Sequence, residues 1–305
     1  MTVSIPRTSG ASRNRDTIFV EDARVLGVAT FPGSQYILRL QAPETAARAV
    51  PGTFVHLKCD PAIPMRRPLS IMRVDAAEGW IEVLFKIVGG GLRSLGQRQP
   101  GDLVSLMGPI GNGFRPLHER PRTLLIGGGV GIPPMVFLAE RLHHDAHPWQ
   151  PLVLMGSEIP FPFQVSPSSI EIDWIDRAID GAMPLLDGWH IPCRLASMAA
   201  IERTFRGYVT DLARMWLRAQ NATEREQTEI FACGPTPMLE AVAALAREFS
   251  LPCQVALEEF MACAVGGCAG CTVLVATDKG PAMKRVCVDG PVFDAATVFP
   301  ASPLI

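Results

Sequence analysis

Four cysteines near the C-terminal end constrain this chain more than any other feature of its sequence. Cys263, Cys268, Cys271 and Cys287 follow the spacing C-x4-C-x2-C-x15-C. Three thiols within nine residues predict a tight loop around a shared ligand. The spacing is that of thiolates that bind a plant-type [2Fe–2S] cluster.

The residues between these cysteines are small. Ala264, Gly266, Gly267, Ala269 and Gly270 carry no bulky side chain, so backbone N–H groups can turn toward the sulfurs of a cluster. A structural zinc site with four cysteine ligands is the alternative, but such a site usually shows two C-x2–4-C pairs. Here three ligands are crowded together and the fourth is alone, which favours iron–sulfur. Four unligated thiols are a third alternative.

Composition and charge exclude several broad classes of protein. The chain has 305 residues, of which 48% are hydrophobic and 19% charged, and this globular balance suits two or three domains. A net charge of −2 excludes a basic nucleic-acid surface over the whole molecule. The first sixteen residues lack the apolar stretch of a secretory signal and predict a loose leader. No apolar run reaches the ~20 residues that span a bilayer, so we expect a cytoplasmic protein without a membrane partner or a disulfide framework.

Residues 17–118 show a pattern of short strands. Alternating runs stand between turn signals such as Pro51-Gly52 and Pro100-Gly101. The clearest runs are residues 35–40, 53–57, 80–86 and 103–106. Frequent short strands without a long helical window predict a small antiparallel β-barrel or sandwich.

Strands alternate with helices after Pro121. Buried-strand patterns cover residues 123–126, 151–156 and 229–234, and helical patterns cover residues 135–142 and 238–249. This alternation predicts a parallel α/β sheet over residues 119–250, followed by the cysteine module at 251–305. The stretch 157–197 is rich in Pro and Ser and allows no assignment.

Two loops of the predicted sheet carry a nucleotide-binding pattern. Residues 127–134, GGGVGIPP, follow a strand and open a helix, so the backbone can approach a phosphate at the helix N-terminus. Residues 233–238, CGPTPM, also follow a strand and open a helix. Loops at the carboxyl ends of parallel strands can line one ligand crevice. The alternatives are a tight turn without a ligand for the first loop and a small buried thiol for Cys233.

A third motif lies in the predicted barrel. Residues 66–71, RRPLSI, contain an arginine whose fork of donors suits a pyrophosphate and a serine whose hydroxyl can meet a ring nitrogen. Glycine-rich runs follow at residues 89–91 and 108–113. For the motif alone, a surface arginine on an edge strand is the alternative.

In this order, the motifs resemble those of the electron-transfer subunits of NAD-linked, type B dihydroorotate dehydrogenase, within the ferredoxin reductase superfamily. The resemblance covers residues 17–299. It rests on residues 67–70, 108–114, 127–134, 233–235, the four cysteines and the segment 287–293. It implies a multidomain β plus α/β fold with an antiparallel FAD-binding barrel, a parallel NAD-binding sheet and a small [2Fe–2S] module.

The resemblance also implies roles for individual residues. Arg67 would hold an FAD phosphate, Ser70 would face the flavin ring, and Gly91 and Leu92 would give backbone contacts to the diphosphate. The family usually has Gly-Thr at this last pair, and Leu92 has no hydroxyl to donate. The implied FAD-binding set is Arg67, Pro68, Leu69, Ser70, Leu84, Phe85, Lys86, Gly91 and Leu92. The implied NAD-binding set is Gly128, Gly129, Gly131, Cys233, Gly234, Pro235 and Met238, and the four C-terminal cysteines would ligate the cluster.

These cofactors together imply a path for electrons. A nicotinamide exchanges two electrons as a hydride and a [2Fe–2S] cluster carries one, so flavin must lie between them. No organic-substrate site with its own acid or base is recognisable, so we expect substrate oxidation on another chain. The resemblance implies that this partner is an FMN-containing dihydroorotate dehydrogenase catalytic subunit of pyrimidine biosynthesis. The alternatives are an NAD(P)H-dependent ferredoxin- or sulfide-type reductase subunit and a non-catalytic iron–sulfur regulator.

Apolar residues around the cysteines predict where the partner binds. Phe260, Val265 and Phe293 are among the apolar side chains near the cluster in sequence. Such side chains suit the core of a docking face in a hetero-oligomer. The alternative is that the two phenylalanines only pack under the cluster loop.

Overall fold

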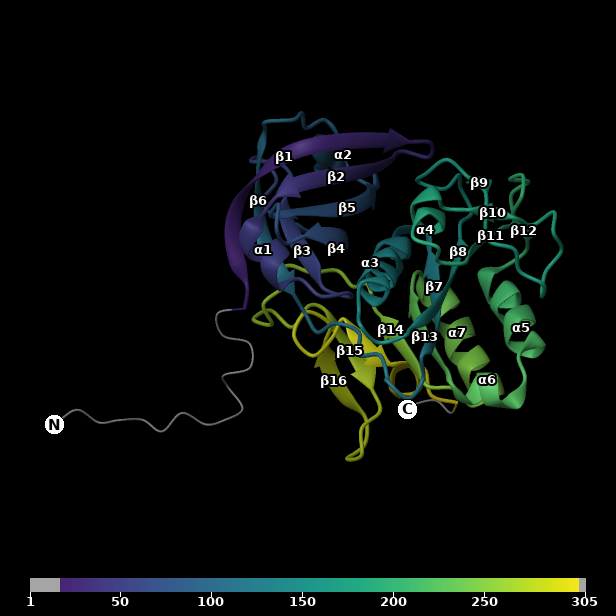
Figure 1. The fold of residues 1–305 in the computed structure, drawn as a ribbon. Helices are drawn as coiled ribbons and strands as arrows, with labels where there is room; N and C mark the ends of the chain where they lie inside the picture. Colours follow the sequence, from purple (N-terminus) through teal and green to yellow (C-terminus); the bar gives the residue numbers. More distant parts are fainter. Residues whose placement is uncertain (1–16, 302–305) are drawn as a thin grey trace.

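An antiparallel barrel forms the N-terminal part of the molecule (Figure 1). The computed structural model describes residues 17–301, so the predicted leader lies outside the described residues. Within this range six strands close in the order β1-β2-β5-β4-β3-β6. Their bounds are β1 Phe19–Phe31, β2 Gln35–Gln41, β3 Phe54–Lys58, β4 Arg67–Asp75, β5 Trp80–Lys86 and β6 Leu103–Ile110. The predicted barrel is confirmed.

Alternating side chains fill the barrel. Leu38, Leu57 and Ile81 come from three different strands and are fully buried in its interior. Two short helices contribute to the same core: α1 (Pro43–Arg48) adds Ala46, and α2 (Gly90–Gly96) adds Leu95. The barrel therefore has a hydrophobic core of its own.

Seven strands of the described chain form the second sheet. Their order is β12-β11-β8-β7-β13-β14-β17, and all neighbours are parallel except β14 and β17. The bounds are β7 Arg122–Gly128, β8 Gln150–Gly156, β11 Cys193–Ser197, β12 Phe205–Arg206, β13 Thr228–Cys233, β14 Cys253–Ala256 and β17 Val292–Asp294. The predicted parallel α/β sheet is confirmed, with one antiparallel edge strand.

Helices cover both faces of this sheet. In β7, Leu125 packs on the face covered by α3 (Ile132–His143), while Leu124 and Ile126 pack on the opposite face. That opposite face is covered by α5 (Val209–Ala219) and α7 (Thr236–Phe249). Burial on both faces explains the continuous apolar run in β7. Shorter elements are β9 Ser166–Pro167, β10 Gly181–Ala182, α4 Pro184–Gly188 and α6 Ala222–Glu226.

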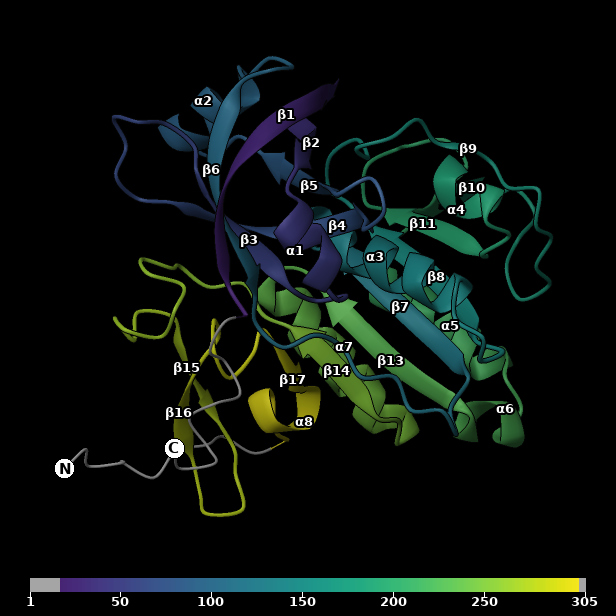
Figure 2. The same cartoon turned by 60° about the vertical axis from the view of Figure 1, so that its left-hand side comes forward.

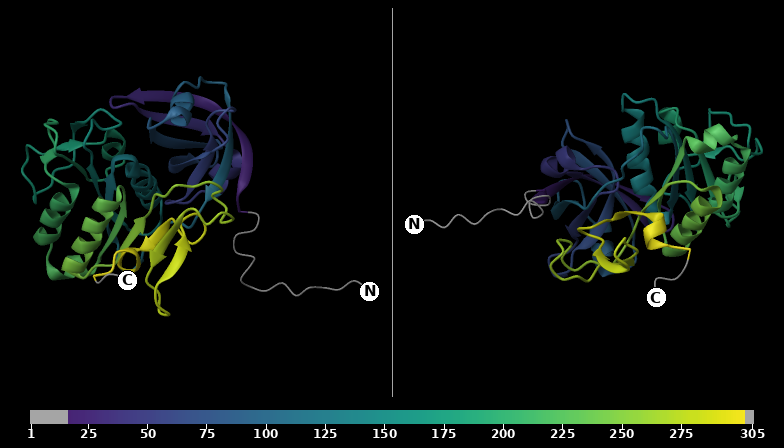
Figure 3. Two further views of the ribbon diagram at one scale, coloured as in Figure 1. Left: turned by 180° about the vertical axis from the view of Figure 1, so that it is seen from behind. Right: turned by 90° about the horizontal axis from the view of Figure 1, so that it is seen from below.

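The C-terminal segment, in yellow, lies below the barrel and beside the sheet (Figure 3, left). Its two-stranded sheet pairs β15 (Thr272–Val275) with β16 (Ala282–Arg285), and the cluster loop precedes it. The chain then returns to the large sheet as β17, which is followed by α8 (Ala295–Val298). The expected domain boundary at residue 250 stays a prediction, although β14 and β17 both belong to the large sheet.

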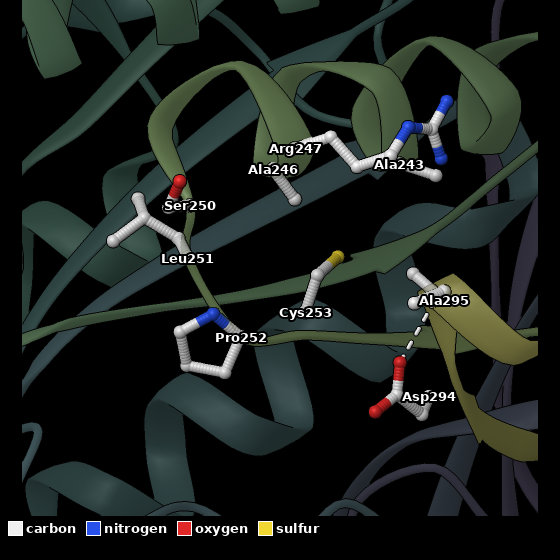
Figure 4. A pocket seen from close by; sticks show the side chains of 10 residues that line it. Ala243, Ala246, Arg247, Ser250, Leu251, Pro252, Cys253, Asp294 and Ala295 are labelled. Atoms are coloured by element: carbon white, nitrogen blue, oxygen red, sulfur yellow. Dashed lines mark hydrogen bonds between the residues drawn. The ribbon is translucent and has the colours of Figure 1, made fainter. Parts of the chain in front are cut away.

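A small cavity lies where α8 meets α7 and β14 (Figure 4). It has a volume of about 340 Å³ and is lined by Cys253, Arg247 and Ser250 among others. The Asp294 carboxylate caps α8 by accepting a hydrogen bond from the Ala296 N–H at 2.8 Å. None of the residues implied in cofactor binding lines this cavity.

Helix α3 joins the barrel to the sheet (Figure 2). It packs on the sheet through Met135 and Ala139, while Phe137 on the same helix belongs to the barrel core. The Gln35 side chain adds a second connection by donating to the Pro160 carbonyl at 2.7 Å. The barrel and the sheet therefore share one continuous packed interface.

Candidate functional site

The Arg67 guanidinium is available for an anion. Its Nη1 donates to the carbonyls of Met65 and Arg66 at 2.9 and 3.1 Å, and no carboxylate among residues 17–301 pairs with it. It also lies against the start of α2, since a Cβ on Gly91 would come within 3.6 Å of its Nε. An unneutralised guanidinium beside a glycine backbone fits a diphosphate.

The side chains of the other implied flavin residues, on β4, β5 and α2, differ in the direction in which they pack. The side chains of Phe85 and Leu92 lie in the barrel core, so only their backbones are free to contact a cofactor. Leu84 faces the opposite way and packs with the sheet domain, and Lys86 and Ser70 are half-buried. The buried position of Leu92 explains why an apolar residue is tolerated there.

The implied nucleotide loops lie side by side. Residues Gly127 and Cys233 are paired across β7 and β13, so the two strands end at the same edge of the sheet. A Cβ on Gly131 would overlap the Cys233 carbonyl, and a Cβ on Gly128 would overlap the Met238 sulfur. Glycine is therefore required for this close approach, and the two loops are in contact at one edge of the sheet.

The nucleotide loops also meet the flavin strands. Met72 of β4 and Leu84 of β5 share one hydrophobic cluster with Ile132 and Cys233. Burial, and then the Glu258 carboxylate, raise the pKa of the Cys233 thiol well above its ordinary value. Cys233 is therefore a neutral thiol at the junction of barrel and sheet. The proximity of Glu258 was not foreseen, because nothing in its local sequence distinguishes it from other acidic residues.

The four C-terminal thiols gather in two pairs. The sulfurs of Cys271 and Cys287 are 3.3 Å apart, and the Cys268 N–H donates to the Cys263 sulfur at 3.4 Å. Among the described residues, no group of three or more His, Cys, Asp or Glu side chains converges as one metal ion would require. Two pairs suit two iron atoms with two thiolates each, whereas a tetrahedral zinc site needs four ligands at one point.

The backbone of the cluster loop turns its N–H groups toward sulfur. Ala264 and Ala269 have φ angles of 56° and 53°, in the left-handed region that few residues other than glycine adopt. Burial raises the pKa of the Cys263 thiol, but hydrogen bonds from the backbone of Val265 and Cys268 outweigh it and lower the pKa to about 7. The same donors would stabilise the negative charge of a cluster.

The two thiol pairs differ in burial. Cys271 and Cys287 are buried, and burial followed by the neighbouring Cys271 thiol raises the pKa of Cys287 to about 12. Cys268 is exposed. A cluster held here would therefore have one side toward the barrel and one toward solvent.

Two apolar side chains in the segment that carries the first three cysteines are exposed to solvent. Phe260 is 93% exposed and Val265 is 52% exposed, whereas Phe293 packs against the cluster module. A cavity of about 650 Å³ opens next to Cys287 and is lined by Val265 and Arg285 as well. Of the two phenylalanines, Phe293 packs under the cluster loop, as the alternative interpretation expects, and Phe260 does not.

Comparison with known proteins identifies the family. Residues 258–299 match the model described as the iron–sulfur cluster binding domain of dihydroorotate dehydrogenase B, and residues 33–114 match an oxidoreductase FAD-binding domain. The dihydroorotate dehydrogenase B (NAD(+)) electron transfer subunit of Desulforamulus reducens is 32% identical over 281 residues, which cover 90% of this chain and 96% of that one. This chain belongs to that family of electron transfer subunits.

Further relatives agree with this membership. The electron transfer subunit of the same name from Bacillus caldolyticus is 33% identical over 291 residues, covering 93% of this chain and 98% of the relative. The predicted family, the oxidoreductase class, the FAD-binding domain and the iron–sulfur module are confirmed.

Solved structures of other reductases share the fold of this electron transfer subunit. The structure of an NADH-dependent reduced ferredoxin-NADP oxidoreductase superposes with a TM-score of 0.71 at 23% identity, covering 91% of this chain and 90% of that one. A ferredoxin reductase in carbazole 1,9a-dioxygenase gives a TM-score of 0.57 at 23% identity, covering 76% and 65%. Across residues 17–301, no helix is long and apolar enough to cross a membrane.

We expect Cys268→Ser to remove the cluster without removing flavin reduction. The substitution takes away one of the four implied ligands at an exposed position, while the residues implied in FAD and NAD binding stay intact. Iron and acid-labile sulfide should fall to background, and NADH-dependent reduction of an artificial dye should persist. Wild-type protein that contains zinc and no labile sulfide would contradict the iron–sulfur assignment.

We expect Arg67→Ala to weaken FAD retention by about ten- to a hundredfold in affinity. A charge-assisted hydrogen bond at a partly buried site contributes on the order of 1.5–3 kcal/mol. FAD content after extensive dialysis measures the effect, with the exposed Arg93→Ala of α2 as the control. Equal FAD content in wild type and Arg67→Ala would show that Arg67 does not hold the phosphate.

Proposed function

We propose that this chain passes electrons from a dihydroorotate dehydrogenase catalytic subunit to NAD⁺ by way of a [2Fe–2S] cluster and FAD. The proposal assigns the implied roles to Arg67 and Ser70 for FAD, to the loops 127–134 and 233–238 for NAD, and to the four cysteines for the cluster. When bound, FAD exchanges a hydride with nicotinamide and single electrons with the cluster.

The position of strand β4 supports this order of cofactors. Ser70 on β4 is the cross-strand partner of Phe54 on β3. The Phe54 side chain packs in one hydrophobic cluster with Cys271 and Cys287. Two residues after Ser70, Met72 packs in the other cluster, with Cys233. The strand that would face the flavin ring therefore lies between the thiols and the nucleotide loops.

Hydrogen bonds fix the cluster module against the barrel. The Asn112 side chain donates to the carbonyls of Val288 and Asp289 at 3.0 and 3.2 Å, and its backbone N–H donates to the Gly290 carbonyl at 2.6 Å. These bonds hold the segment that follows Cys287 beside the end of β6. A fixed separation between the flavin strand and the thiols supports electron transfer inside one chain.

The chain's own residues set the conditions of the two transfers. The neutral Cys233 thiol adds no negative charge of its own where the two nucleotide loops meet and a hydride would move. The buried interface around Met72 and Leu84 keeps water from that junction. Arg67 lies at the start of β4, away from that junction, where it would compensate the negative charge of the diphosphate.

The proposed function requires a partner that oxidises dihydroorotate. We infer that this partner is an FMN-containing catalytic subunit and that the two chains form a hetero-oligomer. The exposed Phe260 and Val265, next to the exposed Cys268, are suited to the core of its docking face. We place the complex in the cytoplasm. An NAD(P)H-dependent reductase subunit that serves a ferredoxin or sulfide-linked partner is the competing function.

We expect Val265→Glu to uncouple the two subunits. A charge at the centre of an apolar docking face must be desolvated, so co-elution and NAD⁺ reduction by dihydroorotate in the reconstituted mixture should fall about tenfold or more. NADH–dye activity should stay at the wild-type level. Met198→Glu is the matched control, because Met198 is 54% exposed on the sheet domain.

Three outcomes would contradict the proposal at different levels. If Val265→Glu leaves both co-elution and coupled activity intact, the docking face lies elsewhere. If the wild-type chain binds no dihydroorotate dehydrogenase catalytic subunit, the partner assignment is wrong and the competing reductase function takes its place. If the protein contains no FAD and does not react with NADH, a non-catalytic regulator is indicated.

A further inference from the structure

An arginine–glutamate pair connects the barrel to helix α3. The Arg73 Nη2 and Nε donate to the Glu140 Oε1 at 2.6 and 3.1 Å, and Nε is also 3.3 Å from Oε2. The guanidinium lies 5.6 Å from the ring centre of Trp80 in the barrel and 5.2 Å from that of Trp189 after α4. Each domain therefore contributes an aromatic ring and one member of the ion pair.

A β-bulge aims Arg73 at the helix. Ile71 and Val74 both pack toward the barrel core, which strict alternation along a strand would not allow. The register shifts between Ile71 and Arg73 against β5, so Met72 is the extra residue. Met72 and Arg73 consequently both face α3. Bulges of this kind re-aim a side chain at a defined place.

The two elements joined by this pair begin at the two candidate cofactor sites. Strand β4 starts with Arg67 and contains Ser70, three residues before Arg73. Helix α3 starts directly after Gly131, and Glu140 lies about two turns further along it. A change in the angle between β4 and α3 would therefore move the nucleotide loop relative to the flavin strand.

We propose that the Arg73–Glu140 pair is a positioning element that fixes the nicotinamide relative to the flavin for hydride transfer. This inference rests on the proposed function. The apolar contacts between α3 and β4 are not directional and permit sliding, whereas a forked ion pair fixes both distance and angle. Reacting atoms must be held about 3–3.5 Å apart, and misplacement by about 1 Å can slow a reaction a hundredfold.

An ion pair that contributes to stability alone would not affect the alignment of the two candidate cofactor sites, so a second ion pair serves as the comparison. The side chains of Arg73 and Glu140 are 21% and 12% exposed, so the pair is neither fully buried nor freely solvated. The barrel offers a matched pair for comparison: Arg39 binds Glu82 at 2.7 Å and lies over the same Trp80 ring, at 4.2 Å. That pair joins two strands of one barrel, and although Glu82 is the cross-strand partner of Arg73, neither Arg39 nor Glu82 forms an ion pair with a described residue of α3.

The experiment compares Glu140→Gln, Arg73→Gln and the double variant with the control Arg39→Gln, all as FAD-loaded full chains. Stopped-flow absorbance gives the rate of flavin reduction at saturating NADH and, separately, the dissociation constant of NADH. We expect a ten- to hundredfold slower reduction in both single variants, with a change below about threefold in NADH affinity. The double variant should be no slower than either single variant, because both remove the same contact.

A second measurement does not depend on activity. Amide hydrogen exchange of the FAD-free proteins should be faster in the second half of α3 in Glu140→Gln and Arg73→Gln, and unchanged there in Arg39→Gln. Flavin reduction at the wild-type rate in Glu140→Gln, or equal slowing in Arg39→Gln, would overturn the positioning role while leaving the proposed function intact. Wild-type protein whose flavin NADH does not reduce would overturn the proposed function, and the positioning role with it.

Discussion

The pairing of β3 with β4 is the contact on which the rest of the molecule depends. It places Phe54, which packs against two of the thiols, directly across from Ser70, while Met72 further along β4 packs against the nucleotide side. A path that converts a two-electron carrier into a one-electron carrier needs flavin between the other two groups. Two neighbouring strands of one barrel meet this requirement, because the β-bulge at Met72 directs its side chain to the nucleotide side while Phe54 packs against the thiols.

The two thiol pairs differ in burial, so one end of the proposed electron path lies at the barrel and the other lies at the solvent-exposed surface. Cys271 and Cys287 are buried against the barrel, whereas Cys268 is exposed, as are Phe260 and Val265 earlier in the same segment. In plant-type spacing a cluster has two irons, so one side can face the flavin and the other a partner. Backbone N–H groups that lower the pKa of Cys263 to about 7 favour the thiolate at the more exposed pair.

Local patterns were enough to predict much of this architecture. The cysteine spacing, the glycine loops after β7 and β13, and the alternating strands are all signals within a few residues. The burial of Phe85 on β5 also follows from such a pattern, since alternation along a strand assigns each side chain to a face. Membership of β14 and β17 in the large sheet was not foreseen, because the cysteine module separates them in sequence.

Long-range contacts were beyond the reach of the sequence for a physical reason. Arg73 and Glu140 are 67 residues apart, and neither differs locally from an ordinary surface charge. Their meeting depends on a bulge in β4 and on the packing angle of α3, which tertiary structure alone determines. Glu258 beside Cys233 is a similar case, since two separate segments bring the carboxylate and the thiol together.

An anaerobic titration of the purified chain with NADH tests the central claim most directly. Flavin absorbance and electron paramagnetic resonance follow the two centres in the same sample. Because FAD takes two electrons and a [2Fe–2S] cluster takes one, the account predicts full reduction at roughly 1.5 NADH per chain, with the signal of a reduced cluster. Reduction that ends at about one NADH per chain with no cluster signal would contradict a path that runs from nicotinamide through flavin to the four cysteines.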